Sequence, residues 1–139
     1  MITKLTRTVY TETGHRISNY DGACSNLHGH SYKWDLTFSG EVDKRTGFVI
    51  DFKILKGWAS IIENAFDHTF VAYKNDPIFN GYINLDVHSQ RVLYLDNQPT
   101  VENMLAYIAP QIMQVTGDKL KLESIKCRET HNNYAEIIL

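Results

Sequence analysis

Residues 28–39 have the sequence HGHSYKWDLTFS, in which imidazole, aromatic or apolar side chains occupy every second position. Alternation with a period of two is typical of a β-strand that buries one of its faces. His28 and His30 belong to the same set as Tyr32, Trp34 and Leu36, so both imidazoles are expected to point toward the apolar layer. A buried imidazole needs a polar partner, and a metal ion is one way to supply it.

Two further metal-binding side chains precede this histidine pair. Cys24 lies four residues before His28, and His15 lies thirteen residues before it. Three protein ligands with a fourth position open to water or substrate are typical of a catalytic zinc site. The segment therefore predicts an open metal centre. Two other interpretations stay open: a chance histidine pair, and a closed structural site in which Cys24 is the fourth ligand.

The composition narrows the class of protein. The 139 residues are 43% hydrophobic and 22% charged, which suits a single soluble domain over residues 1–139. Fourteen basic residues against sixteen acidic ones provide no basic field for nucleic acid. The sequence has no apolar run of membrane-spanning length and no signal-peptide core, so we expect no membrane partner and a cytoplasmic location.

Hydrophobic spacing predicts the remaining elements. One amphipathic helix is expected over 53–66, and a second is expected to begin after Thr100 as its N-cap. Short strands are expected at 48–50, 82–87, 91–95, 120–127 and 134–138 and over the first dozen residues. The order predicts an α+β fold, with both helices on one face of an antiparallel sheet.

Six short motifs, each weak alone, are spread over nearly the whole chain. They are His15, Cys24 to His30, GFVIDF at 47–52, Asp67-His68, PTVEN at 99–103, and Glu129-Thr130. In this order and spacing they resemble the 6-pyruvoyltetrahydropterin synthase and 6-carboxy-tetrahydropterin synthase family. The resemblance implies the tunnelling fold, an antiparallel four-stranded sheet with two helices on one face, here with an extra hairpin between the helices. It also implies a homo-oligomer, commonly a hexamer, with active sites at subunit interfaces.

The same resemblance implies a role for each site residue and Zn²⁺ as the cofactor. The residues are the metal ligands His15, His28 and His30, the catalytic residues Cys24, Asp67 and His68, and the pterin-binding residues Thr100, Val101 and Glu129. Without the family spacing, Asp67 would be interpreted as a helix-end residue and Asp51 as a turn residue. Arg16, Lys33 and Arg128 are candidates for contacts with a triphosphate group.

The gap between Cys24 and His28 is similar to that of the 6-carboxy-tetrahydropterin branch. This implies a lyase that converts 7,8-dihydroneopterin triphosphate into 6-carboxy-5,6,7,8-tetrahydropterin, a queuosine precursor, with release of acetaldehyde and triphosphate. Two alternatives keep the scaffold: elimination of triphosphate to give 6-pyruvoyltetrahydropterin, and a pterin-binding metalloprotein without catalysis. A cupin-type metal enzyme also carries His-x-His on a strand, but two amphipathic helices argue against it. The chain departs from the family at Thr11 to Gly14 and in its long 69–98 segment.

Overall fold

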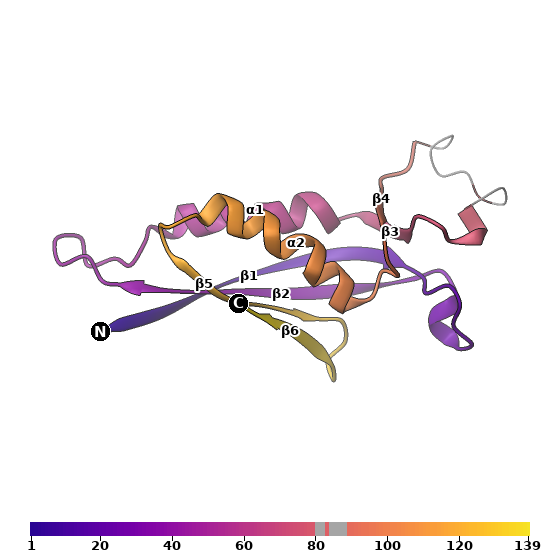
Figure 1. Ribbon diagram of the computed structural model, residues 1–139, viewed down its shortest axis with the longest axis horizontal. Coiled ribbons are helices and arrows are strands. Elements are labelled where there is room, and N and C mark those ends of the chain that lie inside the picture. The colour runs from indigo at the N-terminus through magenta and orange to yellow at the C-terminus, as the bar shows by residue number, and fades with distance from the viewer. Residues whose placement is uncertain (80–82, 84–88) are drawn as a thin grey trace.

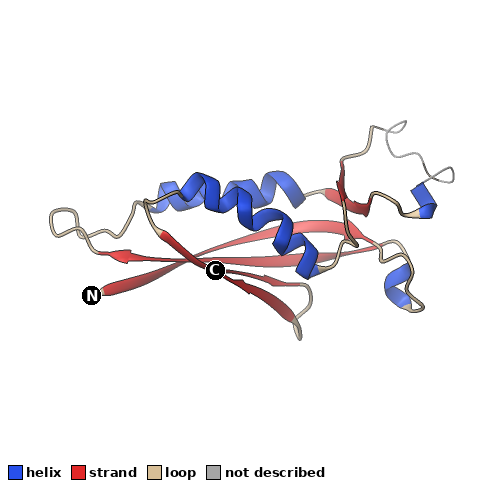
Figure 2. Cartoon of the chain, viewed as in Figure 1, coloured by secondary structure: helices blue, strands red, loops and turns tan. Residues whose placement is uncertain are grey.

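The computed structural model describes residues 1–79, 83 and 89–139 (Figure 1). Its elements in chain order are β1 (Ile2–His15), η1 (Ala23–Ser25), β2 (His28–Glu41), α1 (Phe52–Phe66), β3 (Thr69–Tyr73), η2 (Pro77–Phe79), β4 (Val92–Leu95), α2 (Val101–Thr116), β5 (Lys121–Arg128) and β6 (Tyr134–Ile138). Helices α1 and α2 lie side by side over one face of the sheet (Figure 2). Over the described ranges, every helix is too short or too polar to cross a membrane.

The predicted sheet, antiparallel with four strands, is wrong in both the number and the direction of its strands. The described residues form a mixed sheet of six strands in the order β4-β3-β1-β2-β5-β6. β1, β2, β5 and β6 are antiparallel neighbours, whereas β3 pairs in parallel with both β1 and β4. The sequence pattern does not predict β3, because its five residues directly follow α1 and are mostly apolar, without alternation.

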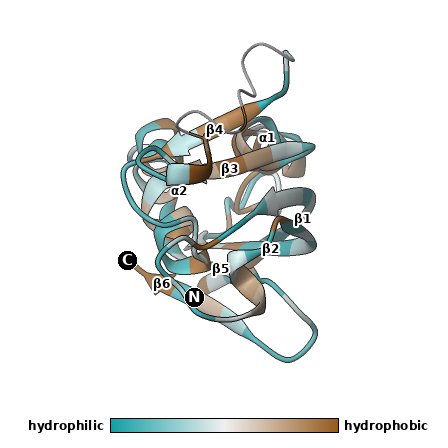
Figure 3. Cartoon of the chain, turned by 90° about the vertical axis from the view of Figure 1, so that its right-hand side faces the viewer, coloured by the Kyte–Doolittle hydropathy of each residue, from teal (hydrophilic) through white to brown (hydrophobic). Residues whose placement is uncertain are grey.

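The segment between the helices holds one of the two strands of the predicted extra hairpin. The strand predicted at 91–95 is confirmed as β4, which runs parallel to β3. The strand predicted at 82–87 lies outside the described residues, apart from Ile83. Strands β3 and β4 are coloured mainly as hydrophobic in Figure 3; β3 is mostly buried, whereas β4, at the edge of the sheet, buries only Leu95 fully.

The strand predicted at 48–50 is wrong, because residues 43–48 form a turn whose main-chain groups hydrogen-bond to one another. The Asp43 carboxylate accepts hydrogen bonds from the amides of Arg45 and Thr46, and the Asp43 amide donates to the Phe48 carbonyl. Asp51 then begins α1 as its N-cap, accepting from the Lys53 amide at 2.8 Å. The predicted helix over 53–66 is confirmed.

The long strand predicted at 28–39 is confirmed, and its apolar side forms the centre of the core. Tyr32, Trp34 and Phe38 on β2 are fully buried beneath the helices. The Trp34 ring stacks on Phe66 of α1 with centroids 5.0 Å apart, and Phe38 contacts Trp58 at 5.3 Å. Burial of each such ring stabilises the fold by about 1.5–3 kcal/mol, so the face of β2 that carries the histidines is held against the helices.

Helix α2 begins beside the histidine end of the sheet. The Thr100 hydroxyl accepts from the Asn103 amide, which confirms the predicted N-cap. The main-chain carbonyl of Pro99, just before this cap, lies 2.7 Å from Nδ1 of His15. The start of α2 is therefore fixed to the end of β1.

Candidate metal centre

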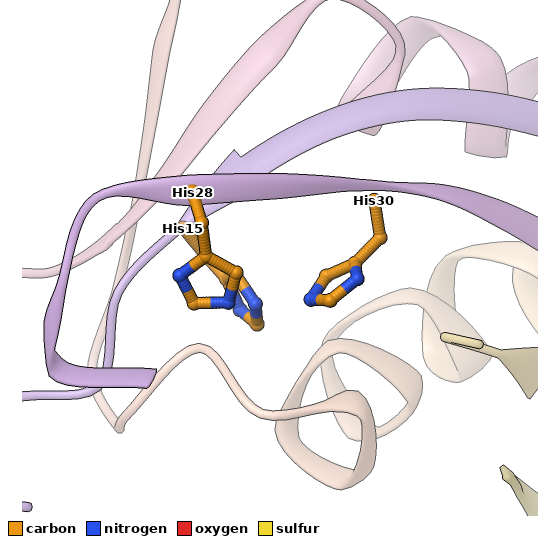
Figure 4. A group of neighbouring side chains, drawn as sticks. All are labelled: His15, His28 and His30. Atoms are coloured by element: carbon orange, nitrogen blue, oxygen red, sulfur yellow. The ribbon is translucent and has the colours of Figure 1, made fainter. Parts of the chain in front are cut away.

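The register between β1 and β2 brings three histidines together. His15 lies directly opposite His28, and Thr13 lies opposite His30, so all three imidazoles share one face at one end of the ladder. Ring centroids are 4.6 Å apart for His15 and His28 and 5.2 Å apart for His15 and His30. One nitrogen of each ring lies within 4.8 Å of the other two, and Figure 4 shows the rings on the same side of the strands.

Main-chain carbonyls orient two of these rings. Nδ1 of His15 lies 2.7 Å from the Pro99 carbonyl oxygen, and Nδ1 of His28 lies 2.7 Å from the Asn26 carbonyl oxygen. A carbonyl oxygen can only accept, so both Nδ1 atoms carry the hydrogen. Each ring is thereby left with Nε2 as its metal-binding atom, an arrangement typical of metal-ligating histidines.

The Glu129 carboxylate lies against the exposed side of the histidine group. Its Oε1 atom is 3.0 Å from Nε2 of His30 and 3.3 Å from Nε2 of His15. Burial lowers the pKa of His30, although the carboxylate opposes this effect, and the close contact with the His15 imidazole lowers the pKa of Glu129. An ionised carboxylate therefore faces a ring that favours its neutral form.

These residues fit a zinc ion. Within the described part of the chain, the buried Nε2 of His30 makes no hydrogen bond, despite its short distance to Glu129, because the contact is not aligned as one. An unsatisfied buried nitrogen costs about 1–3 kcal/mol. A nitrogen lone pair that faces a carboxylate oxygen is repelled unless a proton or a metal cation lies between them. His15, His28 and His30 could hold such a cation, and imidazole nitrogens suit zinc.

A cavity of about 220 Å³ opens beside the histidines. It brings together Cys24 from η1, Glu129 from the end of β5, and the first residues of α2. Its lining residues are His15, Ile17, Cys24, Thr100, Val101, Glu102, Glu129, Asn133, Tyr134 and Ala135. The last three were absent from the predicted site, although their place in a tight hairpin just after Glu129 is a signal that could have indicated them.

Asp67 and His68 lie elsewhere. Asp67 accepts a hydrogen bond from the Glu12 amide at 2.9 Å, which lowers the pKa of its carboxyl group, and its other oxygen is 3.1 Å from Nδ1 of His68. His68 is 79% exposed and lines a larger cavity of about 540 Å³. Glu12, Thr13, His30 and Ser31 also line this cavity, whereas Cys24 lines the cavity of about 220 Å³. In one chain, the predicted acid/base pair is thus separated from Cys24.

The three candidates for triphosphate contacts have different surroundings. Arg16 is mostly buried and bonded to the fully buried Asp76. Arg128 lies over the Tyr134 ring, 4.9 Å from its centroid, and donates to the His131 carbonyl. Lys33 pairs with Arg128 across the sheet, on the side away from the histidines. None of the three lines the cavity beside the histidines.

Comparisons with known proteins agree with this geometry. The family model for 6-pyruvoyl tetrahydropterin synthase matches residues 4–138. The chain is 31% identical over 141 residues to the 6-carboxy-5,6,7,8-tetrahydropterin synthase of Rickettsia bellii, covering 96% of this chain and 99% of that protein. The enzyme of the same name from Rickettsia felis is 29% identical over 137 residues, with the same coverage.

Solved structures share the fold. An uncharacterized protein from Wolinella succinogenes matches with a TM-score of 0.83 at 18% identity, covering 99% of this chain and 98% of that one. The 6-pyruvoyl tetrahydropterin synthase of Caenorhabditis elegans matches with a TM-score of 0.73 at 22% identity, covering 99% and 96%. With the family model matched over nearly its whole length, this chain belongs to the 6-pyruvoyl tetrahydropterin synthase family.

Proposed function

We propose that this protein is a zinc-dependent lyase that converts 7,8-dihydroneopterin triphosphate and one water into 6-carboxy-5,6,7,8-tetrahydropterin, releasing acetaldehyde and triphosphate. The observation that carries the proposal is the cavity at which His15 of the histidine group, an exposed thiol and the Glu129 carboxylate meet. The names of the Rickettsia relatives support the choice of product. The product would enter the synthesis of deazapurines such as queuosine.

The metal would be held by His15, His28 and His30, and it supplies a Lewis acid that stabilises negative charge on substrate oxygens. Cys24 is exposed at the same cavity, where its thiolate can take a proton from substrate carbon. Because Cys24 lies in the loop that joins His15 to His28, a substrate bound at this cavity can contact both the thiol and the metal site.

Glu129 is the residue suited to hold the pterin ring. Its carboxylate is partly exposed to the cavity and has a lowered pKa, so both oxygens can accept N–H groups from an aminopyrimidinone edge. Thr100 and Val101 line the same cavity at the start of α2. The amides of a first helical turn have no partner inside the helix and can donate to a ligand. These groups would orient the ring before reaction.

A second copy of the chain would supply Asp67 and His68, making the active form a homo-oligomer. The Asp67–His68 pair is already formed, and its imidazole is exposed at a cavity whose lining residues do not include Cys24. An imidazole titrates near neutral pH and suits a second proton transfer in the same reaction. A site that needs this pair is therefore incomplete within one chain.

Mixing two inactive variants tests the shared site. Cys24→Ala and His68→Ala should each abolish turnover, while a mixture that has exchanged subunits should recover part of it. The recovery is expected because some interfaces then combine an intact thiol with an intact imidazole. If mixed oligomers form without any recovery, the two residues do not act across an interface.

A product assay tests the reaction itself. The zinc-loaded protein is incubated with 7,8-dihydroneopterin triphosphate, and the pterin and small products are identified by mass. The 6-carboxy product with acetaldehyde supports the proposal, whereas 6-pyruvoyltetrahydropterin would assign the alternative elimination reaction. The absence of both would reject both reactions and leave a pterin-binding metalloprotein. Cys24→Ala, which should keep its zinc, is the control for turnover by free metal.

A further inference from the structure

The loop that carries Cys24 is held by hydrogen bonds and not by burial. Cys24 lies in the middle of η1, and none of the three residues of this turn is buried. The Ile17 amide donates to the Cys24 carbonyl at 2.8 Å, and the Ser25 amide donates to the Gly22 carbonyl at 3.1 Å. The position of the thiol therefore depends on a few polar contacts.

Arg16 adds a second link, from this turn to Asp76 in the segment after β3. Its Nη1 donates to the Ser25 carbonyl at 3.1 Å, and its Nε donates to Oδ2 of Asp76 at 2.7 Å. The side chain of Arg16 is 17% exposed and that of Asp76 is fully buried. A guanidinium group is planar and rigid, so two bonds from its two edges fix the distance between their acceptors.

Asp76 is itself fixed on the other side. Its second oxygen accepts from the Ile78 amide at 3.0 Å, at the start of η2. η2 ends in Phe79, whose ring packs against Phe70 at 5.6 Å. The carboxylate thus has a partner on each oxygen and gives Arg16 a rigid support.

We propose that Arg16 is a positioning residue that fixes Cys24 beside the histidines, with Asp76 as its support. The inference rests on the proposed catalytic role of Cys24. It gives Arg16 the role of positioning the Cys24 thiol. It also removes Arg16 from the candidates for contacts with the triphosphate group. A misplacement of a reacting group by about 1 Å can cost on the order of 100-fold in rate, so this support matters for turnover.

The zinc ligands should depend little on this support, because His15 and His28 are also held by their pairing across the β1–β2 ladder. The His15 ring is held by the Pro99 carbonyl, and Ser18 is tied to Gln98 by two hydrogen bonds, of 3.0 Å and 2.6 Å. Variants of Arg16 can therefore move the thiol and leave the metal site in place.

Arg16→Lys tests the proposal, because lysine keeps the charge for Asp76 but lacks the rigid planar group. Arg45→Lys, at an exposed position in the turn after β2, is the matched control. Arg16→Lys should keep its zinc and its thermal midpoint, with kcat lowered about 10- to 100-fold and KM within about threefold. The rate at which iodoacetamide alkylates Cys24, measured at one pH, should change by at least about threefold, whereas Arg45→Lys should match the wild type.

A second variant keeps the test decisive. Asp76→Asn can still accept from the Ile78 amide but loses the charged partner of Arg16, and it should reproduce the Arg16→Lys pattern. The alkylation assay needs no substrate, so it tests the position of the thiol even if the proposed reaction is wrong. The proposal is overturned if Arg16→Lys is alkylated and turns over at the control rates. It is also overturned if KM rises while alkylation stays unchanged, since Arg16 would then contact substrate directly.

Discussion

His15 and His28 face each other across the β1–β2 ladder, with ring centroids 4.6 Å apart and each Nδ1 bonded to a main-chain carbonyl. Both rings are thereby oriented before any ion binds.

His28→Ala should remove one of three ligands and reduce bound zinc from about one per chain to near zero, as measured by metal analysis after dialysis. His68→Ala is the contrasting variant, which should keep its zinc and lose its turnover. Full zinc binding by His28→Ala would place the metal elsewhere.

Glu129→Gln should weaken pterin binding and spare the metal. The amide keeps the size of the side chain but loses the charge that strengthens hydrogen bonds from the pterin edge. A hydrogen bond to a charged group contributes about 1.5–3 kcal/mol, so the dissociation constant of a pterin ligand should rise about 10- to 100-fold. Titration calorimetry of zinc-loaded protein measures the change, with Glu136→Gln on the exposed side of β6 as the control. Equal affinities for the two variants would remove Glu129 from the binding site.

Gly14→Ala should destabilise the fold through Phe70. A Cβ atom at Gly14 would lie 2.8 Å from Cδ2 of Phe70, well inside van der Waals contact. Such overpacking costs about 1–3 kcal/mol of the free energy of unfolding, measured by urea denaturation. The cost should largely disappear when Phe70 is also replaced by alanine. Gly57→Ala, within α1 and with nothing within 4 Å of its Cβ position, should instead stabilise the protein by about 0.5–1 kcal/mol.

The two thiols should differ in reactivity. Cys24 is exposed, whereas Cys127 is fully buried in β5, and burial raises the pKa of its thiol so that it stays protonated. A chromogenic disulfide reagent should therefore modify one thiol per native chain and two after denaturation. Cys24→Ala should reduce the native count to zero. A rapid second reaction in the native state would mean that β5 opens readily.

The free energy of unfolding should fall at acid pH. The hydrogen bond from the Glu12 amide lowers the pKa of Asp67 below its ordinary value of 3.8. A group whose pKa is lower in the folded state stabilises the fold above its ordinary pKa, and this stabilisation is lost as the pH falls through the folded value. Metal-free protein should thus lose unfolding free energy below about pH 4. Asp67→Asn should flatten this acid limb, while Asp118→Asn in the exposed turn before β5 should leave its slope unchanged.

Local pattern alone was enough to place several parts of the molecule. The alternation over 28–39 determined that His28 and His30 lie on the buried face, and helical spacing determined α1 and the start of α2 at Thr100. Both depend on the geometry of a single element, in which the direction of each side chain follows from its position in the repeat. The side chains of an element can therefore be assigned to a face without knowing its neighbours.

Only the tertiary structure decided which of these faces meet. The register that sets His15 opposite His28, the approach of Glu129 from β5, and the separation of Asp67 from Cys24 all depend on pairings between distant segments. The parallel direction of β3 and β4 also depends on such pairings, because a short apolar strand becomes parallel or antiparallel only through the neighbour it joins. The residues of each element thus determine the chemistry that it offers, and long-range hydrogen bonding and packing decide which of these groups share a cavity and which do not.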